Sequence, residues 1–152
     1  MPYRKDYWDD PKAPKVTSRK ASASVLVQDD SGRVLLLQRT DNKLWTIPTG
    51  AVKKNETVAQ AAIRECQEET GLVVDLLGLV GVFSDPRHII AYKREVRQPI
   101  NICFRAEVIA GTLTTTNEAS AVEWVSDPDS YDIHPAIRQR IRHGLSSREP
   151  YW

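Results

Sequence analysis

Cysteine, methionine and long apolar runs are scarce in this sequence. Its 152 residues include one methionine and two cysteines, Cys66 and Cys103, which lack the CxxC spacing of zinc or redox sites. Two isolated thiols cannot build a disulfide framework, so we expect both to be reduced and buried. No apolar run is long enough to cross a bilayer, and the opening segment MPYRKDYWDDPK lacks the apolar core of a secretory signal. We therefore expect a cytoplasmic protein with no membrane partner.

Net charge is also nearly absent. Lys and Arg number 21 and Asp and Glu number 20, which gives a formal net charge of +1. Without a global positive field we expect no nucleic-acid partner, and any anion must be recognised locally. The length suits one domain with a single core.

The first twenty residues differ in composition from the rest. They contain three prolines and mixed charges, and they also carry Tyr3, Tyr7 and Trp8. We predict an N-terminal arm over residues 1–20 that docks on its own domain, docks on a second subunit or stays disordered. After this arm we predict one domain over residues 21–145 and a C-terminal tail over residues 146–152. The aromatic arm suggests a homodimer.

Strand-like runs and two helical patterns fill the predicted domain. The predicted strands cover residues 21–28, 33–39, 44–48, 72–83, 99–110 and 120–125. The first two flank an Asp-Gly-type turn and predict a β-hairpin, whereas residues 84–98 are predicted to be a loop. Helices are predicted within 55–70 and at 134–145. This order predicts an α/β fold with a mixed sheet.

The stretch GAVKKNETVAQAAIRECQEETGL, Gly50 to Leu72, is the most informative in the chain. Asn55 is the predicted N-cap of its helix, because a short polar side chain can accept a hydrogen bond from the first turn. Val58 to Thr70 contains strong helix formers, and Gly71 provides the left-handed residue that ends the helix.

Three carboxylates share one face of this helix. Glu65, Glu68 and Glu69 are spaced i, i+3, i+4, so they repel one another unless a positive group lies between them. Arg64 alone cannot neutralise them together with Glu56. A hard divalent cation can, and ligands that are all oxygen point to Mg²⁺ or Mn²⁺. Mg²⁺ in such sites is usually completed by water and substrate phosphates. The alternative is a charged helix that simply faces solvent.

The full spacing is more specific than the acidic face. It reads G-x5-E-x7-R-E-U-x-E-E-x-G-U, with U apolar, and is filled by Gly50, Glu56, Arg64, Glu65, Cys66, Glu68, Glu69, Gly71 and Leu72. Average residue usage would produce seven such identities by chance less than about once in a million. The pattern resembles the Nudix box of the Nudix hydrolases. The resemblance implies a Nudix-type α/β/α sandwich with a mixed β-sheet over roughly residues 21–144.

In that family the box helix holds metal ions. The resemblance therefore implies these ligands in this chain: Glu65, Glu68, Glu69, the backbone carbonyl of Thr49, and Glu118. Relatives frequently have glycine where this chain has Thr49, so a positive φ there would strain the threonine. Glu118 lies in a loop six residues before Trp124, and an exposed loop carboxylate is its alternative interpretation.

The implied reaction is hydrolysis of a nucleoside diphosphate linked to another group. Metal ions polarise the phosphates and activate a water molecule that attacks phosphorus in line. Glu65 or Glu68 is the candidate general base, although some relatives use a loop glutamate. Arg64 and Glu56 orient the carboxylates.

Substrate choice is expected to depend on residues outside the box. The candidate substrate-binding residues are Trp45, Arg39, Arg87 and His88. Trp45 could instead pack in the core, and the basic loop could instead be a solvated hairpin or a dimer contact.

Pro86 follows Gly71 by fifteen residues, close to a proline associated with ADP-ribose pyrophosphatases. This spacing favours ADP-ribose or a nucleotide sugar as the small-molecule substrate. The alternatives are a mutator-type (d)NTP pyrophosphatase and a non-catalytic nucleotide-sensing module. A sensing module often loses box glutamates, and this chain retains them all.

Overall fold

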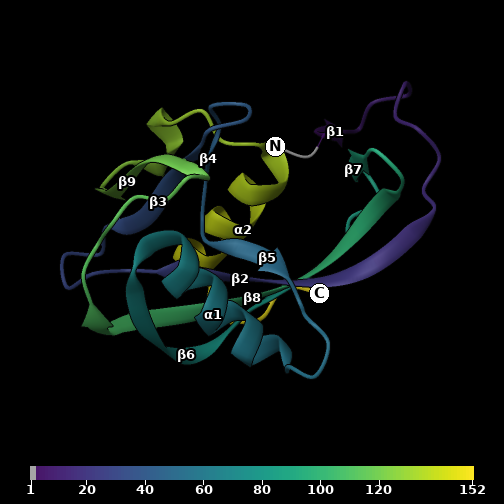
Figure 1. The fold of residues 1–152 in the computed structure, drawn as a ribbon. Helices are drawn as coiled ribbons and strands as arrows, with labels where there is room; N and C mark the ends of the chain where they lie inside the picture. Colours follow the sequence, from purple (N-terminus) through teal and green to yellow (C-terminus); the bar gives the residue numbers. More distant parts are fainter. Residues whose placement is uncertain (1–2) are drawn as a thin grey trace.

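The computed structural model describes residues 3–152, which form nine strands, two α-helices and one short 3-10 helix (Figure 1). The strands are β1 (Arg4–Trp8), β2 (Ser18–Val27), β3 (Val34–Arg39), β4 (Trp45–Thr46), β5 (Thr49–Ala51), β6 (Leu72–Phe83), β7 (His88–Tyr92), β8 (Val96–Gly111) and β9 (Ala119–Val125). The helices are α1 (Val58–Thr70) and α2 (Pro135–Ser146), and the 3-10 helix spans Pro128–Ser130. Neither α-helix in this described part is long and apolar enough to span a membrane.

The larger sheet is mixed, as predicted. Its strand order is β1-β7-β8-β2-β5, and β6 pairs with the later part of β8. β2 and β8 run parallel over ten residue pairs, from Ser18 opposite Arg97 to Val27 opposite Ala106, and the other pairs are antiparallel. The long β8 therefore connects the β1-β7 end of the sheet to the end covered by α1.

The predicted hairpin between 21–28 and 33–39 is wrong. β3 belongs to a second, three-stranded sheet of order β4-β3-β9, and only an isolated bridge between Gln28 and Val34 joins it to the end of β2. The reason is competition for the edges of β2, because β8 occupies one edge and β5 pairs along part of the other. The turn at Asp29 to Arg33 forms, but the chain leaves it into a different sheet.

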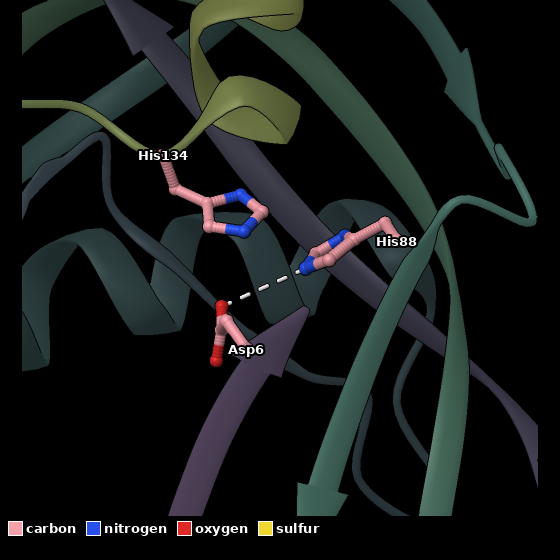
Figure 2. Close-up of side chains that lie close together, drawn as sticks. All are labelled: Asp6, His88 and His134. Atoms are coloured by element: carbon pink, nitrogen blue, oxygen red, sulfur yellow. Dashed lines mark ion pairs between the residues drawn. The ribbon is translucent and has the colours of Figure 1, made fainter. Parts of the chain in front are cut away.

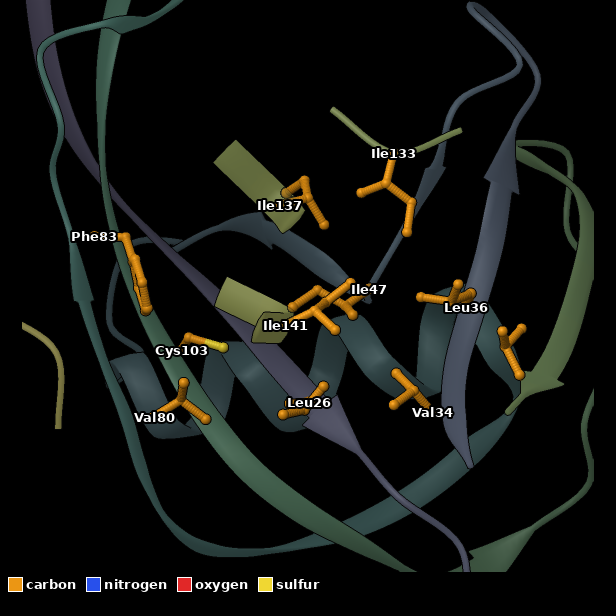
Figure 3. Packing of buried hydrophobic residues seen from close by; sticks show 11 residues of the cluster. Leu26, Val34, Leu36, Ile47, Val80, Phe83, Cys103, Ile133, Ile137 and Ile141 are labelled. Carbon is orange, nitrogen blue, oxygen red and sulfur yellow. The ribbon is translucent and has the colours of Figure 1, made fainter. Parts of the chain in front are cut away.

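The two helices cover opposite faces of the larger sheet. Leu26 packs in a core cluster with Ile137 and Ile141 of α2 (Figure 3), whereas its neighbours Val25 and Val27 pack in a second cluster with residues of α1. Successive side chains of a strand point to opposite faces, so this alternation places α2 on one side of β2 and α1 on the other. The α/β/α sandwich is confirmed.

The predicted loop at 84–98 is also wrong in part, because it contains β7 and the beginning of β8. These strands form a hairpin in which Ile90 pairs with Arg97. Within the predicted arm, residues 4–8 form β1, which lies antiparallel against β7 with Arg4 opposite Tyr92 and Trp8 opposite His88. The beginning of the chain therefore docks on its own domain.

Candidate active site

The N-cap of the box helix lies two residues later than predicted. Thr57 is the N-cap, and its hydroxyl accepts a hydrogen bond from the Gln60 N–H at 3.0 Å. The Gln60 side chain accepts one from the Thr57 N–H at 2.8 Å, which completes a capping box. Asn55 lies in the preceding turn with φ of 66°, so the prediction that Asn55 caps the helix is wrong. The predicted end at Gly71 is confirmed, with φ of 79°.

β5 lies directly against the acidic face of α1. A Cβ atom on Gly50 would lie 2.2 Å from Cδ of Glu65, so only glycine permits this approach. One residue earlier, the Thr49 N–H donates a hydrogen bond to Oε1 of Glu69 at 3.0 Å. Neither Thr49 nor Gly50 has a positive φ, so the strain that a positive φ would cause at Thr49 does not arise.

Arg64 fixes the outer side of the carboxylate cluster. Its guanidinium donates to both oxygens of Glu56 at 2.6 and 3.0 Å, to Glu65 at 2.7 Å and to Glu68 at 3.2 Å. It also donates to the Ala51 carbonyl at 3.1 Å. The hydrogen bonds from Arg64 lower the pKa of Glu56 to about 2, and those to Glu56 and Glu65 raise the pKa of Arg64. This pair therefore stays ionised and orients Glu65.

A cavity of about 260 Å³ opens where α1, β5 and the loop before β9 meet. Glu65, Glu69 and Glu118 line it together with Thr49 and Gly50. Burial raises the pKa of Glu69 well above its ordinary value, and the charges of Glu65 and Glu118 raise it further. Burial and the charge of Glu68 raise the pKa of Glu65, against the opposing effect of Arg64. The positive charge close to these carboxylates is therefore too small to balance their negative charge.

The donor set fits a hard divalent cation. All the acidic groups at the cavity offer oxygen, and neither cysteine is among the lining residues. Glu65 and Glu69 are half-buried and could hold Mg²⁺ or Mn²⁺ together with Glu118, while Glu68 has a side chain that is 54% exposed and lies outside the cavity lining. The arrangement is open on the cavity side, which leaves room for phosphate oxygens and water.

The structure brings some predicted substrate-binding residues to this cavity and separates others. Arg39 lines it and forms an ion pair with Asp41, another lining residue. Trp45 does not line it, but packs edge-on against Tyr131 with ring centroids 5.0 Å apart, in agreement with the core interpretation. Arg87 is exposed, pairs with Asp85 and lies over the Trp8 ring.

His88 and Pro86 lie elsewhere. His88 is buried between β1 and α2, and it lines a smaller neighbouring cavity rather than the one that contains the glutamates. Pro86 lies in the turn before β7 and lines neither of these two cavities. The basic segment is a hairpin, but it is not the solvated hairpin considered from the sequence, because His88, Ile90 and Ala91 are buried and β7 pairs with β1.

Sequence reasoning missed Arg4 and Tyr92, which both line the carboxylate cavity. They come from strands 88 positions apart in the chain and are brought together because they are direct partners in the β1-β7 register. No local pattern indicates that register. The only signal was the cluster of aromatic residues in an otherwise polar N-terminal segment, which indicated docking without naming the partner strand.

The chain is similar to known proteins along most of its length. Residues 18–143 match the NUDIX domain. A MutT-like protein of Streptomyces ambofaciens is 36% identical over 120 residues, which cover 79% of this chain and 71% of that protein. An ADP-ribose pyrophosphatase of Methanocaldococcus jannaschii is 34% identical over 103 residues, covering 65% of this chain and 57% of that protein.

Solved structures agree with the fold. The crystal structure of a NUDIX hydrolase from Nitrosomonas europaea superposes with a TM-score of 0.73 at 22% identity, covering 96% of this chain and 84% of that one. The box residues, the sandwich and the family match all indicate the same relationship. The chain belongs to the Nudix hydrolases, a family of pyrophosphatases that act on phosphoric anhydrides.

Proposed function

We propose that the protein is a Mg²⁺-dependent hydrolase that cleaves the pyrophosphate linkage of a nucleoside diphosphate derivative, with ADP-ribose or a nucleotide sugar as substrate. Mn²⁺ is the alternative ion. The observation that carries the proposal is that Glu65 and Glu69, two carboxylates with raised pKa values, face a cavity next to Gly50 of β5. Such a group of carboxylates favours the binding of a divalent cation. A cation bound there would in turn bind phosphate oxygens of a substrate.

Glu65, Glu69 and Glu118 would hold the metal ion, with Glu68 and the carbonyl of Thr49 as further ligands. The bound ion supplies Lewis-acid polarisation of the phosphates and lowers the pKa of a coordinated water. Arg64 positions Glu65 by a hydrogen bond of 2.7 Å. Glu65 faces the cavity and is the better candidate for the general base, because Glu68 lies outside the lining. Glu118 is the loop glutamate that could serve instead.

Two observations favour ADP-ribose or a nucleotide sugar. The relative from Methanocaldococcus jannaschii is an ADP-ribose pyrophosphatase, and Pro86, fifteen residues after Gly71, lies close to the downstream proline position associated with that activity. Arg39 and Tyr92 line the cavity and could contact a phosphate and a base or ribose. The second candidate function is a (d)NTP pyrophosphatase, which the similarity to the MutT-like relative supports. The complete set of box glutamates disfavours a non-catalytic sensing module.

A substrate panel tests the proposal. ADP-ribose, nucleotide sugars, dinucleotides and (d)NTPs would be incubated with Mg²⁺ in ¹⁸O-labelled water, and the products would be analysed by mass spectrometry. We expect the highest kcat/KM for ADP-ribose or a nucleotide sugar, with ¹⁸O in one of the two monophosphates released. Preferred release of pyrophosphate from a (d)NTP would overturn the substrate assignment. Binding without turnover of any compound would favour the sensing module.

We also propose a cytoplasmic location and a homodimeric assembly for the protein. The nearly balanced charge supports the absence of a nucleic-acid partner. β1 is the end strand of the larger sheet, so its outer edge offers backbone groups to a second copy.

A further inference from the structure

A second cavity, of about 130 Å³, adjoins the carboxylate cavity. The two share Arg4, Thr49, Gly50 and Tyr92 in their linings. The second cavity is enclosed by parts of β1, β2, β5, β7, β8 and α2, and its other lining groups include several basic side chains and no carboxylate. An acidic cavity and a basic cavity therefore lie side by side.

The residues whose buried side-chain atoms lack a hydrogen-bond partner line this second cavity. Within residues 3–152 there are three such side-chain atoms: Nε2 of His88, Nε of Arg97 and Nε of Arg140. All three residues line the second cavity. Buried polar groups are nearly always paired, so three unpartnered nitrogens around one cavity indicate an acceptor that is not part of the protein.

Arg140 gives the strongest indication. The residue is only 3% exposed, and no ion pair or hydrogen bond within residues 3–152 involves its guanidinium. Its guanidinium lies over the ring of Phe83, with Cζ 6.0 Å from the ring centroid. Burial lowers the pKa of Arg140 to about 10, so it remains charged at neutral pH. A buried charge without a counter-ion is unfavourable, and an anion would remove that penalty.

The other cations at the cavity are only partly neutralised. Asp6 forms an ion pair with Arg4, and Glu95 forms ion pairs with both Lys20 and Arg97. The cavity therefore has four cationic side chains against two carboxylates, neither of which lines it. His88 lines the cavity, and the ring centroid of His134 lies 4.9 Å from that of His88. Burial lowers the pKa of both histidines, so they are neutral donors or acceptors.

A metal ion is the competing occupant, because one nitrogen or oxygen atom from each of Asp6, His88 and His134 lies within 4.8 Å of the others (Figure 2). Three contacts oppose it. Arg4 donates to both Asp6 oxygens, at 2.8 and 3.1 Å, and the Ala136 N–H donates to Nδ1 of His134 at 3.1 Å. Figure 2 shows His88 directed at Asp6, but their 3.6 Å separation exceeds a hydrogen bond. A dication there would also face the guanidinium of Arg4.

We propose that the second cavity is an anion-binding site that holds a phosphate group through Arg140, Arg97 and His88. A guanidinium matches the geometry of phosphate oxygens, and Nε2–H of His88 can donate to the same group. Neither cavity alone reaches the usual size of a small-molecule site, about 300–1,000 Å³, but the two together do. The phosphate in this site could come from two sources: a second phosphoryl group of a substrate that spans both cavities, or a free phosphate ion.

The first test needs no metal and no substrate. Binding of inorganic phosphate in EDTA and chloride buffer would be measured by calorimetry and by thermal shift. We expect saturable binding by the wild type and at least tenfold weaker binding by Arg140→Met. Arg142→Met is the matched control, because Arg142 lies on the same helix but is exposed and pairs with Asp129. Absence of binding, or equal binding by the two variants, would overturn the proposal.

Two further variants test the site independently of Arg140→Met. Arg97→Met should also weaken phosphate binding, and Arg140→Lys should retain part of it. Without phosphate, Arg140→Met should melt at a higher temperature than the wild type, because it removes an unpaired buried charge. A lower melting temperature in EDTA and chloride would show that Arg140 is stabilised by the protein alone and would count against the site.

A kinetic comparison separates the two sources of phosphate, and only this step rests on the proposed function. ADP-ribose would be compared with a form that carries an additional phosphomonoester. A lower KM for the phosphorylated form, abolished by Arg140→Met but not by Arg142→Met, assigns the site to the substrate. Equal KM values with intact phosphate binding assign it to a free anion. Failure of hydrolysis would leave the metal-free binding result unaffected.

Discussion

Gly50 determines how closely β5 approaches the carboxylate face of α1. A Cβ atom at this position would meet the Glu65 carboxylate at 2.2–2.6 Å, so Gly50→Ala must displace that group. A displacement of about 1 Å at a catalytic group can lower the rate about 100-fold. We therefore expect kcat/KM to fall by about that factor while the protein still folds. Gly78→Ala is the control, because nothing lies within 4 Å of its Cβ position. Equal activity of the two variants would refute the role of the close contact.

The raised pKa values of Glu65 and Glu69 predict how stability depends on pH. Burial and like charges make the folded protein hold more protons than the unfolded chain, whose Glu pKa is about 4.3. Their stabilising contribution is therefore complete below about pH 4.3 and is lost as pH rises through the folded values. In EDTA, Glu69→Gln should lose less stability with rising pH than the wild type, and Mg²⁺ should stabilise the wild type more at higher pH.

Melting temperatures across this pH range, with and without Mg²⁺, provide the measurement for Glu69→Gln. Glu107→Gln is the control, because Glu107 is exposed on β8 and does not line the cavity. The same pH dependence in Glu69→Gln and the wild type would contradict the proposed carboxylate cluster. Unchanged hydrolysis by Glu69→Gln would overturn its assignment as a metal ligand.

Single residues were predictable where a local rule decides them. Gly71 ends the helix as expected because a left-handed residue is needed there, and the glutamates share a face because of helical spacing. The choice of N-cap was not decided by a local rule, since Asn55 and Thr57 both suit it. Asn55 instead takes the left-handed conformation that asparagine tolerates.

At the level of elements, the capping box predicts a measurable contribution from Thr57. Thr57→Ala removes the acceptor for the Gln60 N–H and should lower the free energy of unfolding by about 1 kcal/mol in urea titrations. Thr57→Ser should retain most of that stability. Asn55→Gly should be neutral or stabilising, because glycine adopts the φ of 66° more readily. If Asn55→Gly were the more damaging change, the helix would begin at Asn55 after all.

Strands were easier to predict than their partners. Alternating and apolar runs located β2, β3, β6, β8 and β9, because side-chain burial has a local period. Pairing depends on which edge is free, and the parallel match of β2 with β8 prevents the expected hairpin with β3. β7 was missed because its HIIAY segment lies among charged residues that resemble a loop. It pairs with β1, and His88 packs against His134 at the beginning of α2, which no local pattern shows.

At the level of the whole molecule, β1 links the beginning of the chain to both cavities. Arg4 lines each of them, and Asp6 lies beside the buried His88. A variant that lacks residues 1–9 would lose these groups and expose the β7 edge, so it should melt at a lower temperature and have a raised KM. Arg4→Met in the full chain should reproduce the KM effect with a smaller loss of stability. Unchanged KM values in both variants would exclude β1 from the substrate site.

The same truncation tests the proposed homodimer. β1 is the last strand of the larger sheet, and its outer edge has no strand partner within residues 3–152, so a second copy could pair with it across a two-fold axis. Light scattering should give the full chain about twice its mass of 17.2 kDa and the variant without residues 1–9 the mass of one chain. Arg4→Met, which leaves the backbone edge intact, should stay dimeric. A full chain that scatters as a monomer would contradict the dimer, and a truncated chain that remains dimeric would place the interface away from β1.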